Sequence, residues 1–469
     1  RNVNPERILS ITFSRASARE MKIRFNDIYG DISNEAAHFS TIHSFAYGLM
    51  REYAFKNGIR YTFIDNDKKD LNKYNILRST YHLLNQEHIT DEKLETLVNL
   101  IGYIKNMLIS PEEFASKIET NIKNFKDIFN HYEKYKENNN LIDFDDMLTL
   151  SLKILRSDRY LLDKYRNKYD YIQVDEGQDT SKVQLAIIET IAHPRNNLFM
   201  VADDDQSIYS FRGAYPKGLF DFNKLYKNAK IFYMEQNYRS SKNIVAICNK
   251  FIAQNTLRHN KNIFTENSFV EPISIVKVNT LDDQYEYIID QMIIRKNYCN
   301  CAILYRNNIS AIGVIEYLSR NNIPFHIRDI KLQFFNHWIL EDILNFLLLA
   351  QNPSNIKPFE KIYFKMKGFI SKKHLGYIKS FDYNRSVFNK LLDSPGVNRF
   401  YKKNFLELEL DFKKLSYMKP YDAICYIENN LEYESYLKES CMRFGYILHH
   451  LENILYLIKI IASKTKSFN

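Results

Sequence analysis

The chain has 469 residues, 45% of them hydrophobic, which exceeds what one hydrophobic core organises and predicts several globular domains. Sixty-five Lys and Arg against fifty-six Asp and Glu leave a formal charge of +9, spread along the chain, which permits a polyanionic partner without requiring one. The five cysteines form no CxxC pair and no apolar run approaches eighteen residues, which excludes a zinc spacing, a disulfide framework and a membrane span and indicates a reducing, cytoplasmic compartment.

The first half of the chain alternates short apolar runs of strand character with helix-length segments. This rhythm predicts parallel strands joined by crossover helices, and therefore an α/β domain over residues 1–52 and 140–233. The interruption, residues 53–139, is charged and spaced like helices, which predicts a helical insertion. The expected strands are Ile8 to Phe13, Tyr171 to Val174, Leu198 to Ala202 and Ile231 to Met234.

A second α/β block is expected over residues 234–352, where a helix near Ile312 to Arg320 lies between strand-like runs. Residues 353–469 are rich in Lys, Tyr and Leu at helical spacing, which predicts a second helical insertion. One apolar stripe of that region comprises Ile447, Leu448, Leu451, Ile454, Leu455 and Ile458. The strand-like runs of the second block are Ile273 to Val278, Ala302 to Tyr305 and Phe325 to Ile327.

The strongest chemical signal is the apolar run Tyr171 to Val174, which ends in Asp175 and Glu176. A parallel sheet presents its ligands at the carboxyl edge, where one acid can hold Mg²⁺ and its neighbour can deprotonate an attacking water in phosphoryl transfer. We assign these roles to Asp175 and Glu176 respectively. An isolated Asp-Glu pair is more often a solvated turn, so the flanking sequence has to support the assignment.

That support comes from a family resemblance. Residues Val174 to Asp179 resemble the Walker B box of UvrD/Rep/PcrA-like superfamily 1 DNA helicases, and Val201 to Ala214 are similar to motif III of the same family. The resemblance implies that Gln206 senses the γ-phosphate of ATP. It also implies that three motif III side chains face single-stranded DNA, where aromatic rings stack on any base, although Phe211 as a core residue stays an open alternative. These side chains are Tyr209, Phe211 and Arg212.

Three further segments resemble motifs of this family. Glu235 to Ser240 resembles motif IV, in which Tyr238 would stack on adenine and Arg239 would point at the γ-phosphate. Ile11 to Met21 resembles motif Ia and Phe39 to Phe45 resembles motif Ib, which implies four DNA contacts. Leu141 to Leu148 matches the segment where the helical insertion rejoins the first motor domain, and we interpret it as architectural. The implied DNA contacts are Thr12, Phe13, Thr41 and His43.

The resemblance implies an α/β fold with two RecA-like parallel-sheet motor domains of the P-loop NTPase type, each carrying a helical insertion. It implies an ATP-dependent DNA helicase of repair or replication that uses ATP and Mg²⁺ and acts on single-stranded DNA and on single/double-strand junctions. No Gly-x-x-x-x-Gly-Lys-Ser/Thr run is present. We therefore expect the sequence to be a piece of a longer protein, truncated before motif Ia and before motifs V and VI, and inactive in ATP turnover by itself.

Two alternatives stay open at this point. A non-catalytic DNA-binding or regulatory relative would keep the fold without ATP turnover, and the presence of Asp175, Glu176, Gln206 and Arg239 argues against it. The chain could also be the motor module of a helicase-nuclease. The sequence identifies no protein partner.

Overall fold

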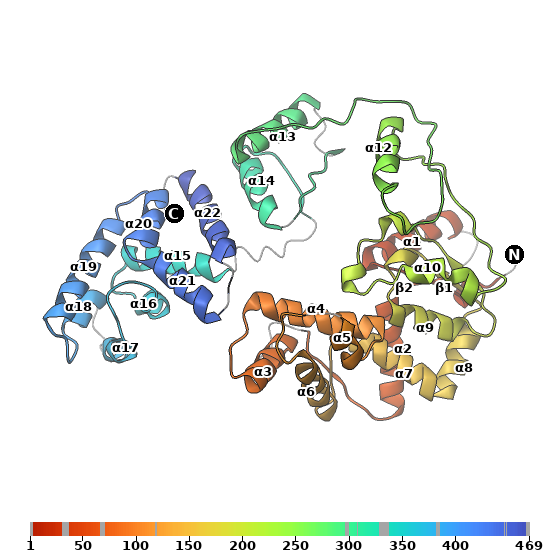
Figure 1. Ribbon diagram of the computed structural model, residues 1–469, viewed down its shortest axis with the longest axis horizontal. Coiled ribbons are helices and arrows are strands. Elements are labelled where there is room, and N and C mark those ends of the chain that lie inside the picture. Colours follow the sequence, from red (N-terminus) through yellow and green to blue (C-terminus); the bar gives the residue numbers. More distant parts are fainter. Residues whose placement is uncertain are drawn as a thin grey trace. The chain divides into compact units, whose positions relative to one another are not determined.

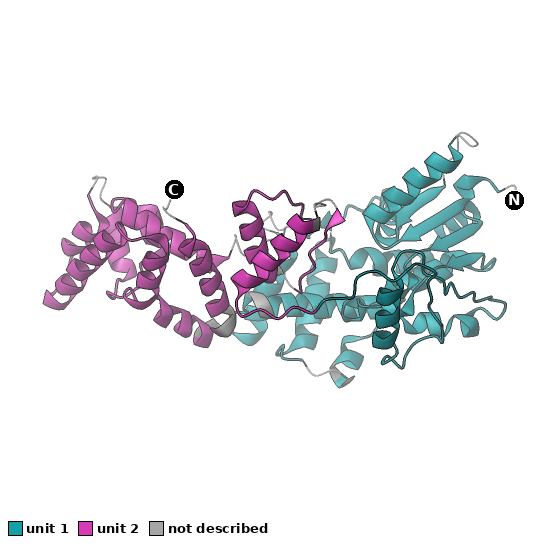
Figure 2. Cartoon of the chain, turned by 90° about the horizontal axis from the view of Figure 1, so that it is seen from above, with its two compact units in different colours: residues 1–274 teal, residues 275–469 magenta. Residues whose placement is uncertain are grey.

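The computed structural model describes residues 3–30, 37–65, 71–117, 120–295, 300–306, 308–327, 337–380, 385–444, 446 and 448–465. The chain divides into two compact units, Arg1–Ser274 and Ile275–Asn469, coloured separately in Figure 2.

The first unit is built on a four-stranded parallel sheet of order β2-β1-β5-β6. Alternate residues of the two central strands, such as Leu9 and Val174, are buried with side chains of the flanking helices in one core. The register places Ile11 opposite Val174, so β1 and β5 end at the same edge. The elements are η1 (Pro5–Arg7), β1 (Ile8–Thr12), α1 (Arg15–Tyr29), β2 (His38–Thr41), α2 (Ile42–Lys56), α7 (Asp146–Ser157), α8 (Arg159–Lys168), β5 (Tyr171–Val174), η2 (Gly177–Asp179), α9 (Lys182–Ala192) and β6 (Leu198–Met200).

Between α2 and α7 the chain forms helices around a separate hydrophobic core (Figure 1). Leu77, Leu97, Ile101 and Ile128 of this core are fully buried, in keeping with apolar side chains at helical spacing. The two chain segments that connect the core to the sheet pair with each other as β3 and β4. The elements are β3 (Thr62–Phe63), α3 (Lys73–Asn85), α4 (Asp91–Met107), α5 (Pro111–Lys117), α6 (Phe125–Asn138) and β4 (Leu141–Ile142).

A buried charge network holds the segment in which these helices rejoin the sheet. The ammonium groups of Lys105 and Lys136 each contact both Asp143 and Asp146, at distances of 2.6–3.1 Å. The Tyr132 hydroxyl donates to Asp143 at 2.9 Å. Burial by itself would raise the pKa of Asp143, but the surrounding lysines hold it well below its usual range. Asp143 is therefore charged, and its contacts together with those of Asp146 tie α4 and α6 to the start of α7.

The remainder of the first unit follows β6 and consists of short helices and loops. An isolated parallel bridge joins Gln236 to Phe264, so the segment after α12 returns to the chain ahead of it. The elements are η3 (Asp204–Gln206), η4 (Ser210–Arg212), α10 (Lys217–Phe220), α11 (Phe222–Leu225) and α12 (Lys242–Ile252).

Four predicted strands do not form a ladder in the structure. The runs Ile231–Met234, 273–278, 302–305 and 325–327 pair with no neighbouring strand among the described residues. Strand character alone does not make a strand, because the backbone N–H and C=O groups need a partner chain alongside. Leu304 is 93% exposed, which shows that its apolar pattern is not used for burial here.

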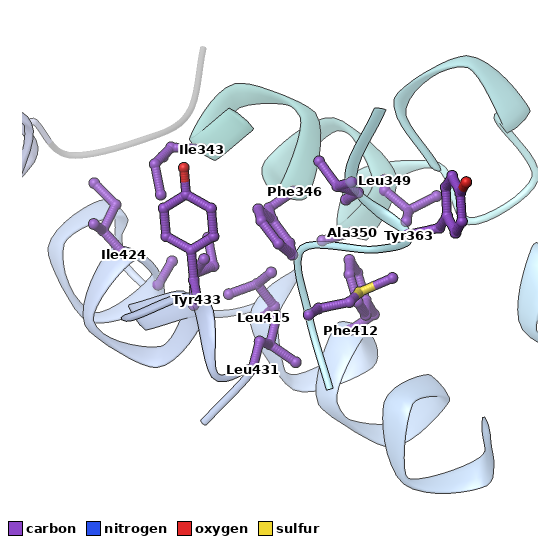
Figure 3. Packing of buried hydrophobic residues seen from close by; sticks show 14 of the residues in the cluster. Ile343, Phe346, Leu349, Ala350, Tyr363, Phe412, Leu415, Ile424, Leu431 and Tyr433 are labelled. Atoms are coloured by element: carbon purple, nitrogen blue, oxygen red, sulfur yellow. The ribbon is translucent and has the colours of Figure 1, made fainter. Parts of the chain in front are cut away.

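The second unit is helical among its described residues. A small core joins α13 and α14 through Ile289, Met292 and Leu318. The larger core lies among α15–α22, where Phe346, Phe412 and Tyr433 pack together (Figure 3). The elements are α13 (Leu281–Arg295), α14 (Asn308–Arg320), α15 (Trp338–Gln351), α16 (Ile356–Ile362), α17 (Lys372–Lys379), α18 (Val387–Leu392), α19 (Arg399–Leu415), α20 (Pro420–Asn429), α21 (Tyr433–Phe444) and α22 (Leu448–Ser463).

The apolar stripe predicted near the end of the chain is confirmed on α22, where Leu451, Ile454, Leu455 and Ile458 are buried. Ile447 lies outside the described residues. Across the part of the chain that the structure describes, no helix has both the length and the apolar character needed to cross a membrane.

The buried network predicts a large cost for removing one lysine. Lys105→Met would leave Asp143 and Asp146 buried with one cation fewer, and we expect the free energy of local unfolding of α4 and α6 to fall by about 3–5 kcal/mol. Amide hydrogen exchange measured by mass spectrometry reports this local opening. Lys123→Met removes a surface pair with Glu87 and should cost at most about 1 kcal/mol. Equal effects of the two substitutions would contradict the prediction.

Candidate functional site

The two acids that follow β5 lie in a turn fixed by the neighbouring strands. The Asp175 N–H donates to Ile11 C=O at 2.9 Å, and the Gly177 N–H donates to Val201 C=O at 2.9 Å. Glu176 has a left-handed backbone with φ of 54°, a conformation that costs energy for a residue other than glycine. The sheet therefore holds Glu176 in a conformation that its own sequence does not favour, as is common at functional sites.

The electrostatics of this turn favour a cation. Burial raises the pKa of Asp175, and the adjacent Glu176 carboxylate raises it further. The same two causes raise the pKa of Asp179 to about 6. Among the described residues, the buried Thr12 Oγ1 and Asp179 Oδ1 have no hydrogen-bond partner. Carboxylate and hydroxyl oxygens are the ligand type that Mg²⁺ prefers, although the three carboxylates of this turn do not converge on one point among the described residues.

A buried glutamine connects the acids to the next predicted motif. Gln178 is 1% exposed, and its Nε2 donates to Glu176 Oε2 at 2.6 Å. Its Oε1 accepts from the Asp203 N–H at 3.0 Å, and Asp203 Oδ2 accepts from Gln206 Nε2 at 2.7 Å. An unbroken hydrogen-bonded path thus runs from Glu176 to Gln206. Gln178 has no role among the residues predicted from the sequence, although its place inside the Walker B-like box was a signal.

The aromatic side chains expected to face DNA lie next to one another and form one exposed group. Phe13 stacks on Tyr209 with ring centroids 5.2 Å apart and an angle of 24° between the planes. The Arg212 guanidinium lies 5.6 Å from the Tyr209 ring centre and 5.4 Å from that of Phe211. Phe211 is 64% exposed, so the interpretation of Phe211 as a core residue is wrong.

Helix α4 of the helical insertion packs against the turn that carries Tyr209, Phe211 and Arg212, which we call the aromatic turn. Gly213 has a φ of 90°, and a Cβ at this position would lie 2.7 Å from the Cβ of Asn106 on α4. Only glycine combines that backbone conformation with so close an approach. Asn106 in turn donates to Asp145 at 3.0 Å, so the insertion is tied both to the aromatic turn and to the buried charge network.

Thr12 and Thr41, expected among the DNA contacts, have buried side chains. Thr12 is 2% exposed because it ends β1 between two paired strands, with Thr41 as its partner on β2. The Thr41 hydroxyl caps α2, where it accepts from the Ser44 N–H at 3.2 Å. The structure therefore gives both threonine side chains structural positions and does not bring them to the exposed aromatic group.

His43 stacks on Phe144, with ring centroids 4.2 Å apart and an angle of 20° between the planes. Phe144 is 45% exposed and belongs to the segment that the sequence analysis treated as architectural. The sequence signal that could have identified Phe144 is an aromatic residue among three aspartates, Asp143, Asp145 and Asp146. Burial lowers the pKa of His43 to about 4, with nearby Asp145 opposing the shift. The imidazole is therefore neutral at physiological pH.

The motif IV residues lie on a separate turn. Asn237 Oδ1 accepts from the backbone N–H groups of Arg239 and Ser240, which fixes the turn, and Tyr238 is 76% exposed. In the described part of the chain, no hydrogen bond or ion pair joins Tyr238 or Arg239 to the carboxylates at the sheet edge. The structure therefore joins Glu176 and Gln206 in one hydrogen-bonded network, with Asp175 next to Glu176 in the chain, and it leaves the motif IV side chains exposed.

Comparison with known proteins identifies the family to which this chain belongs. Residues 1–227 match the UvrD/REP helicase N-terminal domain, and residues 232–435 match the UvrD-like helicase C-terminal domain. The chain belongs to the UvrD-like helicase family. Its fold is accordingly mixed α/β, with a parallel sheet, a majority of helices and two UvrD-type helicase domains.

Curated relatives of this UvrD-like protein carry the name ATP-dependent DNA helicase PcrA. The protein from Staphylococcus epidermidis is 31% identical over 372 residues, which cover 77% of this chain and 50% of the relative. The protein from Staphylococcus aureus is 31% identical over 373 residues, with the same coverage of 77% and 50%. The chain therefore spans about half the length of the curated relatives that it matches.

The depressed pKa of His43 predicts that any contribution of this side chain to DNA affinity would not depend on pH above pH 6. A neutral imidazole gains charge only near pH 4, so acidification from pH 8 to pH 6 should add no His43-dependent affinity. Titration of single-stranded DNA into the full-length protein and its His43→Asn variant measures this. We expect the ratio of the two dissociation constants to stay constant over that range. A ratio that grows at least threefold towards pH 6 would show that His43 becomes charged.

Proposed function

We propose that this chain is the core of an ATP-dependent DNA helicase that moves along single-stranded DNA and separates strands at single/double-strand junctions. The observation that carries the proposal is the hydrogen-bonded path from Glu176 through Gln178 and Asp203 to Gln206. Gln206 lies three residues before Tyr209, which begins the exposed aromatic turn. One short segment thus connects the site proposed for phosphoryl transfer with the surface proposed to stack on DNA bases.

At the nucleotide end, Glu176 accepts a proton from the attacking water, and Gln178 orients its carboxylate. Asp175 would hold the Mg²⁺, directly or through water, and the ion would neutralise phosphate charge. Gln206 contacts the γ-phosphate, Arg239 adds positive charge where negative charge builds up, and Tyr238 stacks on adenine. The motif resemblance supports the roles of Gln206, Arg239 and Tyr238, and the position of the acids at the end of β5 supports those of Asp175 and Glu176, with the hydrogen bond from Gln178 supporting its orienting role.

At the DNA end, Phe13, Tyr209 and Phe211 offer ring faces on which successive bases stack without regard to sequence. Arg212 lies over two of these rings and supplies charge towards the phosphates. His43 and Phe144 form a second stacked pair. Indifference to sequence is what a motor on arbitrary DNA requires.

The proposal extends to organisation and setting. We assign residues 1–52 and 140–233 to the first motor domain, 53–139 to its insertion, 234–352 to the second motor domain and 353–469 to the second insertion. DNA repair or replication in the cytoplasm is the setting that the family relationship favours. The intact acid pair and Gln206 favour a catalytic protein over a non-catalytic relative.

Replacement of the proposed general base tests the catalytic assignment. In the full-length protein, Glu176→Gln should lower ATP turnover by about 10²–10⁴-fold while ATP and DNA binding persist, because only proton acceptance is lost. DNA-stimulated phosphate release and equilibrium binding provide the measurements. Glu189→Gln on α9 changes a carboxylate away from the site and serves as the control. Normal turnover in Glu176→Gln would remove this residue as the base.

Replacement of an exposed ring tests the DNA surface. Phe211→Ala should weaken single-stranded DNA binding by roughly 1–3 kcal/mol, equally for oligonucleotides of different sequence, because one stacking face is lost. Phe55→Ala removes another exposed ring, 92% accessible on α2, and should leave affinity unchanged. Fluorescence anisotropy with labelled homopolymers measures both. An affinity loss confined to one sequence would argue for base readout and against a stacking platform.

A further inference from the structure

Two cations outside every predicted motif bind the acidic run of motif III. Arg258 donates through Nε and Nη2 to the two carboxylate oxygens of Asp205, at 2.9 and 2.7 Å. The Lys261 ammonium contacts Asp203 and lies 2.7 Å from Asp204 and 3.1 Å from Asp205. The Arg258 and Lys261 side chains are 17% and 11% exposed, so their pairs with the largely buried carboxylates of Asp204 and Asp205 are shielded from solvent, whereas the Asp203 side chain is 39% exposed. We call this arrangement the Arg258–Lys261 clamp.

The clamp offsets the repulsion between neighbouring carboxylates. Three consecutive aspartates repel one another, and burial by itself would raise the pKa values of Asp204 and Asp205. Hydrogen bonds from Lys261 and Arg258 instead hold both pKa values below their usual range. The backbone N–H of His259 adds a hydrogen bond to Asp204 at 2.7 Å. The segment 258–261 therefore supplies charge and hydrogen bonds to each of the three aspartates of the acidic run.

On one side the clamp reaches the proposed nucleotide site. Asp203 Oδ1 contacts Lys261, while its Oδ2 accepts from Gln206 Nε2 at 2.7 Å. The carboxylate that holds Gln206 is thus itself held by Lys261. A shift of Lys261 would move the amide expected to sense the γ-phosphate.

On the other side the clamp reaches the motif IV turn. Directly after Lys261, the Asn262 N–H donates to Glu235 Oε1 at 2.6 Å, and Phe264 exchanges backbone hydrogen bonds with Glu235 and Asn237 at 2.9 and 2.7 Å. Asn267 then donates to the backbone C=O of Tyr238 at 3.2 Å. The segment that binds the acidic run is therefore followed directly by residues that hydrogen-bond to the turn in which Tyr238 and Arg239 are exposed.

We propose that Arg258 and Lys261 are positioning residues that set the geometry between Gln206 and the Tyr238–Arg239 turn, so that both groups meet one nucleotide together. The inference rests on the proposed ATP-dependent function. It predicts that the clamp acts on the rate of the chemical step, because misplaced groups lose transition-state contacts more than ground-state binding.

The test compares Lys261→Met, which keeps the side-chain stem and removes the charge, with Lys261→Arg, which restores a cation. Lys250→Met, an exposed lysine on α12 of the same unit, controls for the loss of one positive charge. DNA-stimulated ATP turnover of the full-length protein gives kcat and KM. We expect Lys261→Met to lower kcat at least tenfold with KM within about threefold of the parent, and Lys261→Arg to recover most of kcat. Lys250→Met should behave as the parent.

Other outcomes separate the two proposals. If the parent protein shows no DNA-stimulated turnover, the proposed function fails. If the parent is active and Lys261→Met matches Lys250→Met, the positioning role alone is overturned. Should Lys261→Met not fold, Asp205→Asn keeps the shape of the acidic run and weakens the contact with Arg258. A kcat loss of several-fold at unchanged KM would then support the clamp, and unchanged kinetics would overturn it.

Discussion

The parallel hydrogen-bond ladder between β1, β5 and β6 is the constraint on which the rest of the site depends. Parallel strands end at a common edge, so residues far apart in the chain, Thr12, Asp175 and Val201, become neighbours there. The ladder continues one step beyond the strands through the N–H groups of Asp175 and Gly177, and this extra step forces Glu176 into its left-handed conformation. The position of the proposed base is therefore a property of the sheet.

Among the described residues of the first unit, three groups of carboxylates differ in their surroundings, and this difference separates their roles. Asp143 and Asp146 are neutralised by buried lysines and fasten the insertion to the sheet. The three carboxylates of the run beginning at Asp203 are paired with Arg258 and Lys261. At the edge of the sheet, burial and the Glu176 carboxylate raise the pKa values of Asp175 and Asp179, and buried oxygens have no partner among the described residues. A charge that the described protein groups do not balance is the physical mark of a place for a cation and its phosphates.

The proposed DNA surface is a product of packing between distant segments. Phe13 follows β1 and Tyr209 follows β6, yet their rings stack, and α4 of the insertion packs against the turn that carries Phe211. Gly213 makes that packing possible because a side chain there would collide with Asn106. The insertion thus acts as a support for the aromatic turn, and the buried charge network holds the support in place.

The sequence by itself determined the features that depend on local pattern. These features are the apolar runs before Asp175 and before Asp203, the helical spacing on α22 and the order of the motifs. Each can be recognised from the periodicity of apolar residues or from a short stretch of sequence. The sequence could not determine which apolar runs would find a partner, and the unpaired runs 273–278 and 302–305 show that a strand needs a neighbour that local pattern does not specify. Only the tertiary structure buried Thr12 and Thr41, exposed Phe211 and joined Lys261 to Asp203, because burial and ion pairing are settled by residues dozens to hundreds of positions away.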